Sequence, residues 1–107
     1  MFTVNNVTWD IQYLYPSNSK LKRSDGTYTL GVTDWNDKTI YLSNKLQGAL
    51  LERVLCHELC HCFVFSYRIE MDIETEEIVA DFLSLYGRDV IFELDVILDN
   101  LVKYIAN

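Results

Sequence analysis

The sequence predicts one α+β domain over residues 1–107. In this domain an antiparallel sheet of about three or four strands packs on a central helix and two further helices. Apolar residues alternate through the first 42 positions, an almost wholly apolar helical segment follows, and amphipathic segments complete the chain. Because the strands precede the helices instead of alternating with them, antiparallel pairing is expected. A chain of this length has room for a single core.

The first strand pair is expected around Asn5-Asn6. Phe2 and Val4 alternate before this dipeptide, and the residues from Val7 to Tyr13 alternate after it. A period of two on both sides of a turn-forming pair is typical of a β-hairpin. Pro16 ends the second strand, and the polar residues 17–26 predict a loop.

A second hairpin is expected between residues 28 and 42. Tyr28, Leu30 and Val32 alternate, and the short apolar run 39–42 follows a polar connection. The basic cluster on the preceding loop, which contains Lys20, Lys22 and Arg23, is interpreted as solvated.

Three helices are predicted after residue 43. Ser43-Asn44 is a plausible cap for a helix from about Leu46 to Phe65, whose apolar residues lie nearly all round and therefore predict a buried central helix. A second helix fits residues 73–86, with Gly87 placed to end it. An amphipathic third helix fits residues 89–105.

Composition argues against several classes of partner. The net charge of −7 disfavours nucleic acid, which needs a basic face. No apolar run approaches the length of a membrane span, and the first residues do not resemble a signal peptide. Three cysteines within seven residues are unlike a secreted disulfide framework. We therefore expect a cytoplasmic protein with reduced thiols, bound neither to nucleic acid nor to a membrane.

The strongest functional signal is the segment His57-Glu58-Leu59-Cys60-His61, which contains both histidines of the chain. Histidines four residues apart lie one turn apart on the same helix face, so both rings can reach one ion. Glu58 flanks that ion and is placed to take a proton from water. This is the HExxH motif of zinc peptidases, and Zn²⁺ is the predicted cofactor.

A catalytic zinc ion takes three protein ligands, and the third must come from another element. The acidic candidates lie on the helix after residue 73. Glu77 is preferred to Glu74 because Asp81, one turn later, is placed to accept the outer N–H of a liganding histidine. By helical angle Glu76 points away from this stripe, and Glu74 and Glu76 also fit a solvated acidic helix start. Cys60 is assigned to the core.

At these residues the chain resembles the gluzincins, in which HExxH is followed on a later helix by Glu-x-x-x-Asp. More closely, it resembles the small ImmA/IrrE-like metallopeptidases and related proteins of bacteria, mobile elements and phages, through the strand before the motif and the segment Glu77-Ile78-Val79-Ala80-Asp81-Phe82. The resemblance implies a small zincin-like fold and intracellular cleavage of a protein, often a transcriptional regulator. It also implies that a strand before the active helix, residues 39–42, binds the substrate backbone.

The sequence thus predicts a zinc metallopeptidase that hydrolyses peptide bonds, with His57, His61 and Glu77 as metal ligands and Glu58 as base. Its protein or peptide substrate and its oligomeric state are not specified. The alternative is a non-catalytic, zinc-stabilised interaction domain encoded by a mobile element. Tyr67 and Tyr86 are candidates for the residue that stabilises the transition state, and the pattern does not choose between them.

Overall fold

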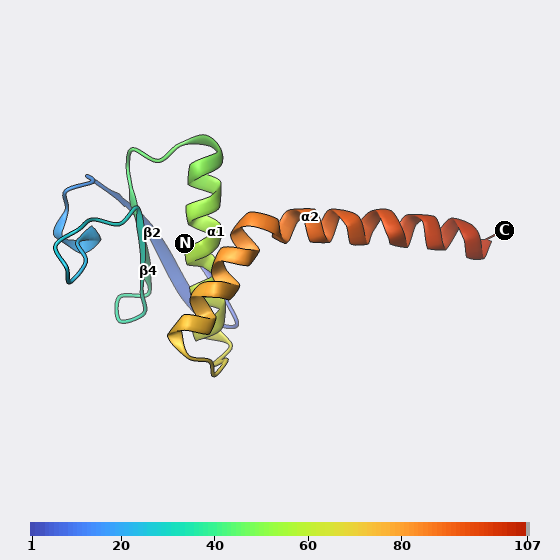
Figure 1. The fold of residues 1–107 in the computed structure, drawn as a ribbon. Helices are drawn as coiled ribbons and strands as arrows, with labels where there is room; N and C mark the ends of the chain where they lie inside the picture. Colours follow the sequence, from blue (N-terminus) through green and yellow to red (C-terminus); the bar gives the residue numbers. More distant parts are fainter. Residues whose placement is uncertain (107) are drawn as a thin grey trace.

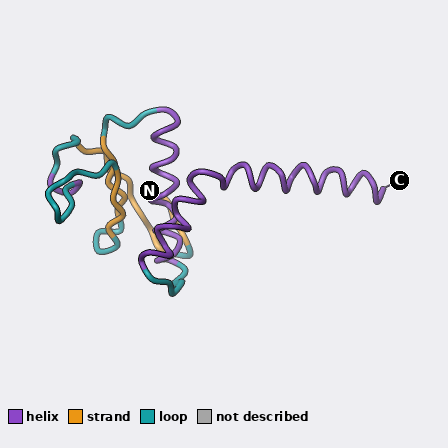
Figure 2. The backbone as a smooth tube through the Cα atoms, in the orientation of Figure 1, coloured by secondary structure: helices purple, strands orange, loops and turns teal. Residues whose placement is uncertain are grey.

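The structure, a computed structural model, describes residues 1–106 and is an α+β domain built from a four-stranded mixed sheet and two helices (Figures 1 and 2). The strands precede the helices along the chain, as predicted. The elements are β1 (Phe2–Val4), β2 (Val7–Leu14), a 3₁₀ turn η1 (Ser19–Leu21), β3 (Gly31–Asp34), β4 (Thr39–Ser43), α1 (Gly48–Ser66) and α2 (Ile73–Ala106).

Both predicted hairpins are present, but the sheet is mixed rather than wholly antiparallel. β1 pairs with β2 and β3 pairs with β4 in antiparallel fashion, and the strand order is β1-β2-β4-β3. The second hairpin joins the first through β4, its later strand, so β2 and β4 run parallel. Alternation in the sequence predicts each hairpin but carries no information about which of its strands docks against the other hairpin.

The central helix begins two residues later than predicted, and its cap differs. Gln47 is the N-cap and makes no side-chain capping bond, so Ser43-Asn44 does not cap α1. Ser43 instead ends β4 and accepts a hydrogen bond from the Lys45 amide. The Ser43 hydroxyl, which could have capped a helix, thus stabilises the turn between β4 and α1 instead.

The two helices predicted after the central one form one continuous helix, and Gly87 does not end it. Gly87 lies inside α2 and does not have a positive φ, so it does not form the expected left-handed cap. A glycine inside a helix costs only about 1 kcal/mol relative to alanine, which the strong helix formers on either side offset. The first turns of α2 lie along α1, and then the helix turns away and projects from the body (Figure 1).

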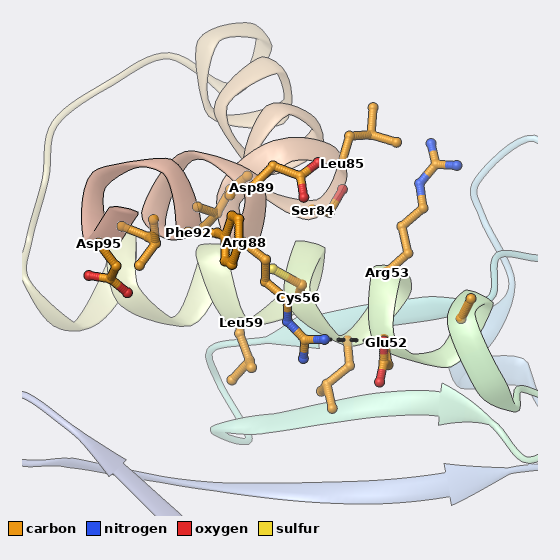
Figure 3. Close-up of a pocket in the computed structure, with 15 residues that line it drawn as sticks. Glu52, Arg53, Cys56, Leu59, Ser84, Leu85, Arg88, Asp89, Phe92 and Asp95 are labelled. Carbon is orange, nitrogen blue, oxygen red and sulfur yellow. Dashed lines mark hydrogen bonds and ion pairs between the residues drawn. The ribbon is translucent and has the colours of Figure 1, made fainter. Parts of the chain in front are cut away.

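A groove of about 770 Å³ marks the point where α2 leaves α1 (Figure 3). Its walls include Cys56 and Leu59 of α1 and Phe92 of α2, and an ion pair from Arg88 to Glu52 crosses it at 3.3 Å. Within residues 1–106, neither helix combines the length and apolar character that crossing a bilayer requires.

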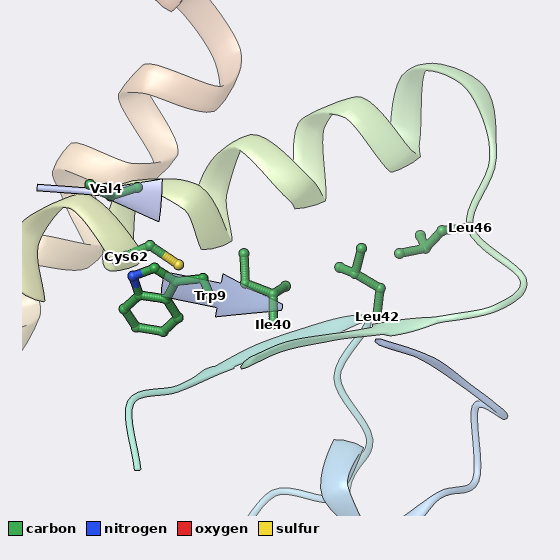
Figure 4. Packing of buried hydrophobic residues seen from close by; sticks show 6 residues of the cluster. All are labelled: Val4, Trp9, Ile40, Leu42, Leu46 and Cys62. Atoms are coloured by element: carbon green, nitrogen blue, oxygen red, sulfur yellow. The ribbon is translucent and has the colours of Figure 1, made fainter. Parts of the chain in front are cut away.

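The main core lies between the sheet and α1 (Figure 4). Its six buried members are Val4, Trp9, Ile40, Leu42, Leu46 and Cys62. The indole N–H of Trp9 donates to the Ser66 hydroxyl at 2.9 Å, which ties β2 to the end of α1. Alternate residues of β4 face the other way, where the loop that carries buried Leu21 covers them. α1 is therefore held against a rigid sheet.

Candidate metal centre

α1 places His57, Glu58 and His61 in one stretch that faces both the sheet and α2. The two histidine rings lie one helical turn apart, with centroids 4.9 Å apart and their Nε2 atoms 3.2 Å apart. His61 is buried and His57 partly buried. The helical spacing read from the sequence thus brings both rings to one point.

The first turn of α2 supplies the acidic groups. Asp72 caps this helix, since its carboxylate accepts a hydrogen bond from the Thr75 amide at 2.8 Å. That bond holds the pKa of the Asp72 carboxyl below its usual value. The cap fixes where α2 starts, and with it the direction in which Glu76 and Glu77 leave the helix.

Glu77 bridges the two histidines. Its Oε2 atom lies 3.1 Å from His57 Nε2, and its Oε1 atom lies 3.0 Å from His61 Nε2. His57, His61 and Glu77 form a group that offers one ligand atom each, all within 4.8 Å of one another. Glu74, the competing third ligand, is exposed and makes no contact with either ring among the described residues.

A second layer of carboxylates holds the outer nitrogens of the rings. Asp81 Oδ1 lies 2.9 Å from His57 Nδ1, which is the arrangement expected for it. Glu76 contacts His61 Nδ1, so the expectation that Glu76 points into solvent is wrong. Glu76 is buried because it lies one turn before Ala80, which is fully buried where the helices meet. That spacing was the signal that could have identified Glu76 from the sequence.

Both nitrogens of each ring face a carboxylate: Nδ1 faces Asp81 or Glu76, and Nε2 faces Glu77. An ionised carboxylate only accepts hydrogen bonds, so a neutral imidazole that donates from Nδ1 presents a lone pair at Nε2. In that tautomer the two Nε2 lone pairs face the Glu77 carboxylate, and a bound cation would offset the repulsion among these acceptors.

The contacts among these groups are close to the spacing of zinc ligands. Tetrahedral bonds of about 2.0–2.1 Å set the ligand atoms roughly 3.3 Å apart. The two Nε2 atoms are 3.2 Å apart, and each contacts a different oxygen of Glu77, His57 at 3.1 Å and His61 at 3.0 Å. Two nitrogens and a carboxylate are also a ligand set that catalytic zinc takes, with its fourth position left open.

Glu58 is buried beside this group, and its Oε2 lies 4.0 Å from His57 Nε2. The Thr33 hydroxyl, from β3, lies 2.9 Å from Glu58 Oε1 and 3.0 Å from its backbone carbonyl, so it holds the side chain from the sheet side. Burial raises the pKa of the Glu58 carboxyl, against the opposing effect of the Thr33 hydrogen bond. A carboxylate that is short of solvent and close to the metal position is suited to accept a proton.

Cys60 belongs to the core, as predicted. It packs with Val64 and Ala80 where α1 meets α2, and burial raises the pKa of its thiol. Cys62 lies in the main core, where burial raises its pKa to about 12. Both thiols therefore stay protonated and apolar in character.

Two cavities of similar size flank the histidines. One, of about 330 Å³, includes His57, Glu58 and Asp81 among its walls, and the other, of about 340 Å³, includes His61 and Glu76. Tyr67 and Tyr86 line neither cavity. Tyr67, the C-cap of α1, stacks on Phe63, and the Tyr86 ring packs at a tilt against Phe82. Tyr28, which the sequence did not single out for chemistry, lines the first.

The strand expected to bind a substrate backbone, residues 39–42, has no free edge for it. β4, which contains these residues, is paired on both sides, with β2 and β3. The free edge next to α1 belongs to β3. The sequence could not show this, because the order of strands in a sheet is set by pairing between distant segments.

His57, His61 and Glu77 are the group that could hold a metal ion, and Asp81 and Glu76 contact the outer nitrogens of the two rings. Searches against protein-family models, curated proteins and solved structures find no match for the chain.

Proposed function

We propose that this protein is a zinc-dependent metallopeptidase in which His57, His61 and Glu77 hold the metal. The observation that supports the proposal is that two imidazole Nε2 atoms and one carboxylate meet within 4.8 Å of one another, beside a buried glutamate. Both outer ring nitrogens are held by further carboxylates, as is usual for histidines that ligate a metal.

His57, His61 and Glu77 would hold a zinc ion, which would supply the Lewis acidity to activate water and polarise a carbonyl group. Glu58 acts as the base: its Oε2 takes a proton from the attacking water and delivers it to the nitrogen of the departing amine. The Thr33 hydroxyl keeps the Glu58 side chain turned toward the site. Asp81 and Glu76 hold the rings in the tautomer that leaves both Nε2 atoms free.

The free edge of β3 favours a peptide as substrate. Ser43 N–H donates to the Leu30 carbonyl, so residues 30 and 43 are a hydrogen-bonded pair of the β3–β4 ladder. Such pairs alternate along antiparallel strands, so Val32 also bonds to β4, whereas the backbone groups of Gly31 and Thr33 point to the open edge. An extended peptide can pair with these groups and lie across the site.

Gly31 is needed at this edge. A Cβ atom there would lie 2.9 Å from Val54 Cγ1 and 3.2 Å from Glu58 Cγ. Glycine therefore lets β3 approach α1 closely enough for Thr33 to reach Glu58.

The resemblance to ImmA/IrrE-like peptidases supports an intracellular, regulatory role with a protein substrate such as a transcriptional regulator. The three cysteines form no disulfide, which agrees with the reducing cytoplasm that we propose as its location.

The deciding experiment compares Glu58→Gln with the wild-type protein, both loaded with zinc. We expect the variant to retain its zinc and lose at least a hundredfold in peptide cleavage, because general-base catalysis contributes about 10²–10⁴-fold. Glu52→Gln is the matched control, since Glu52 is an exposed glutamate of the same helix that contacts Arg88. A mixture of unstructured peptides, read by mass spectrometry, serves as substrate.

The rival function is a non-catalytic zinc domain that binds another protein. In that case Glu58→Gln and the wild type behave alike, with zinc bound in both and cleavage in neither. A purified wild-type protein that takes up no zinc contradicts both functions.

A further inference from the structure

Two arginines lie in the cavity next to the proposed base. Arg23, from the loop before β3, and Arg53, from α1, line the same cavity of about 330 Å³ as His57 and Glu58. The sequence assigned Arg23 to a solvated loop, and the tertiary structure brings it to the site. The chain has nine lysines and arginines against sixteen acidic residues, so two cations in one small cavity stand out.

The nearby carboxylates are engaged elsewhere. Asp25 accepts hydrogen bonds from Thr27, Glu52 pairs with Arg88, Asp81 with His57, and Glu58 with Thr33. Within residues 1–106 neither arginine forms an ion pair, and the Arg23 guanidinium donates only to the Thr29 hydroxyl, at 3.2 Å. The carboxylates that line the cavity, Glu58 and Asp81, are thus already hydrogen-bonded or paired, and two guanidinium groups are free to take an anion.

The direction of a bound peptide follows from the packing of β3 on α1. Gly31 lies against Val54, Thr33 against Glu58, and the Trp35 ring stacks on Phe65 at 5.9 Å. β3 thus runs in the same direction as α1. A peptide paired antiparallel to β3 has its carboxyl-terminal part at the Arg23 and Arg53 end of the site.

We infer that this cavity is a subsite for an acidic side chain on the carboxyl-terminal side of the cleaved bond. Guanidinium groups bind carboxylates through paired, charge-assisted hydrogen bonds. Tyr28 and Leu50 line the same cavity and give the methylene groups of a glutamate an apolar wall. The substrate class is a peptide with glutamate or aspartate just after the scissile bond, and this inference rests on the proposed peptidase function.

The test measures cleavage of paired peptides that carry Glu or Gln after the scissile bond, with the full-length zinc-loaded protein. A charged hydrogen bond contributes about 1.5–3 kcal/mol, so we expect kcat/KM to favour Glu at least tenfold. In Arg23→Gln/Arg53→Gln the ratio should fall to about one. Arg68→Gln is the matched control, because Arg68 lines the cavity on the other side of the histidines.

A second readout does not require turnover. Fluorescence anisotropy compares binding of short peptides that begin with Glu or Gln, which mimic the released fragment, to zinc-loaded Glu58→Gln protein. We expect tighter binding of the Glu peptide, and loss of that difference when both arginines are also replaced.

The outcomes separate the two claims. Cleavage with no preference for Glu overturns the subsite and leaves the peptidase function intact. A preference for an acidic residue before the scissile bond that is abolished by Arg68→Gln shows that the peptide lies in the opposite direction. That result also overturns the proposed subsite. If no peptide is cleaved, the proposed function fails, and equal binding of the two short peptides then removes the subsite as well.

Discussion

α1 and the distal part of α2, residues 88–106, are both rich in apolar residues, yet only α1 buries them. Cys62 of α1 is fully buried, whereas Ile97 of α2 is 60% exposed. α1 has the sheet on one side and the first turns of α2 on the other. The distal part of α2 projects beyond the body, which extends the molecule to 60 × 30 × 28 Å (Figure 1).

The comparison shows that two helices of similar apolar content can differ widely in burial. In α2 the apolar positions 90, 94, 97 and 101 follow one stripe, while α1 is apolar nearly all round. The candidate metal centre lies where two layers hold α1, and packing on both sides fixes the positions of its side chains. The projecting helix contributes no residue to the proposed metal centre.

The largest difference is expected from truncating one leucine in each region. Leu42→Ala should lower the free energy of unfolding by about 2–5 kcal/mol, because it leaves a cavity in the core. Leu94→Ala, at a side chain that is 46% exposed, should change it by no more than about 0.5 kcal/mol. Urea denaturation measures both. An equal loss in the two variants would show that the distal helix is buried in solution.

Zinc should stabilise α1 and the first turns of α2, and it should leave the distal part of α2 unchanged. At a zinc concentration about a hundred times the Kd, binding adds roughly 2.7 kcal/mol to the free energy of unfolding. Native-state hydrogen exchange measures local opening of the chain. Zinc should slow the exchange of amides in residues 57–61 and 73–81, and should not change it in residues 90–102. Addition of a chelator reverses the change. Uniform protection along all of α2 would contradict this division.

Within α2, the acidic residues of the first turns should differ in the same way. Glu76→Gln removes the charge that holds His61 Nδ1 and should weaken zinc binding by about tenfold. Glu74→Gln is the control, because Glu74 is exposed and two residues away. Competition with a chromophoric chelator gives both affinities. Equal affinities would mean that Glu76 has no part in the metal centre.

The smallest effect is expected at the sheet side of the site. Thr33→Val removes the hydrogen bond to Glu58, worth about 0.5–1.5 kcal/mol, and should lower kcat by roughly twofold to tenfold with zinc content unchanged. Thr33→Ser keeps the hydroxyl and should retain most of kcat. If Thr33→Ser lowers kcat as much as Thr33→Val does, the methyl group of Thr33 is important and the hydroxyl is not.

Prediction from the sequence succeeded where the relevant interactions are local. The Asn5-Asn6 turn forms with both residues at positive φ, at 47° and 66°, as a two-residue hairpin requires. The α+β class and the central helix are confirmed. Gly87 misled because a glycine ends a helix only where the following chain leaves it, and here the helical bonds continue on both sides.

The sequence by itself determined that His57, Glu58 and His61 share one helix and that both rings project from the same face. The reason is that helical hydrogen bonds join residues only four apart. Tertiary structure alone decided the parallel pairing of β2 with β4, the free edge of β3, the contact of Glu76 with His61 and the cavity that Arg23 shares with Glu58, the proposed base. Each of these depends on how distant segments cross, and the angle at which α2 crosses α1 is set by packing around Ala80 rather than by any local pattern.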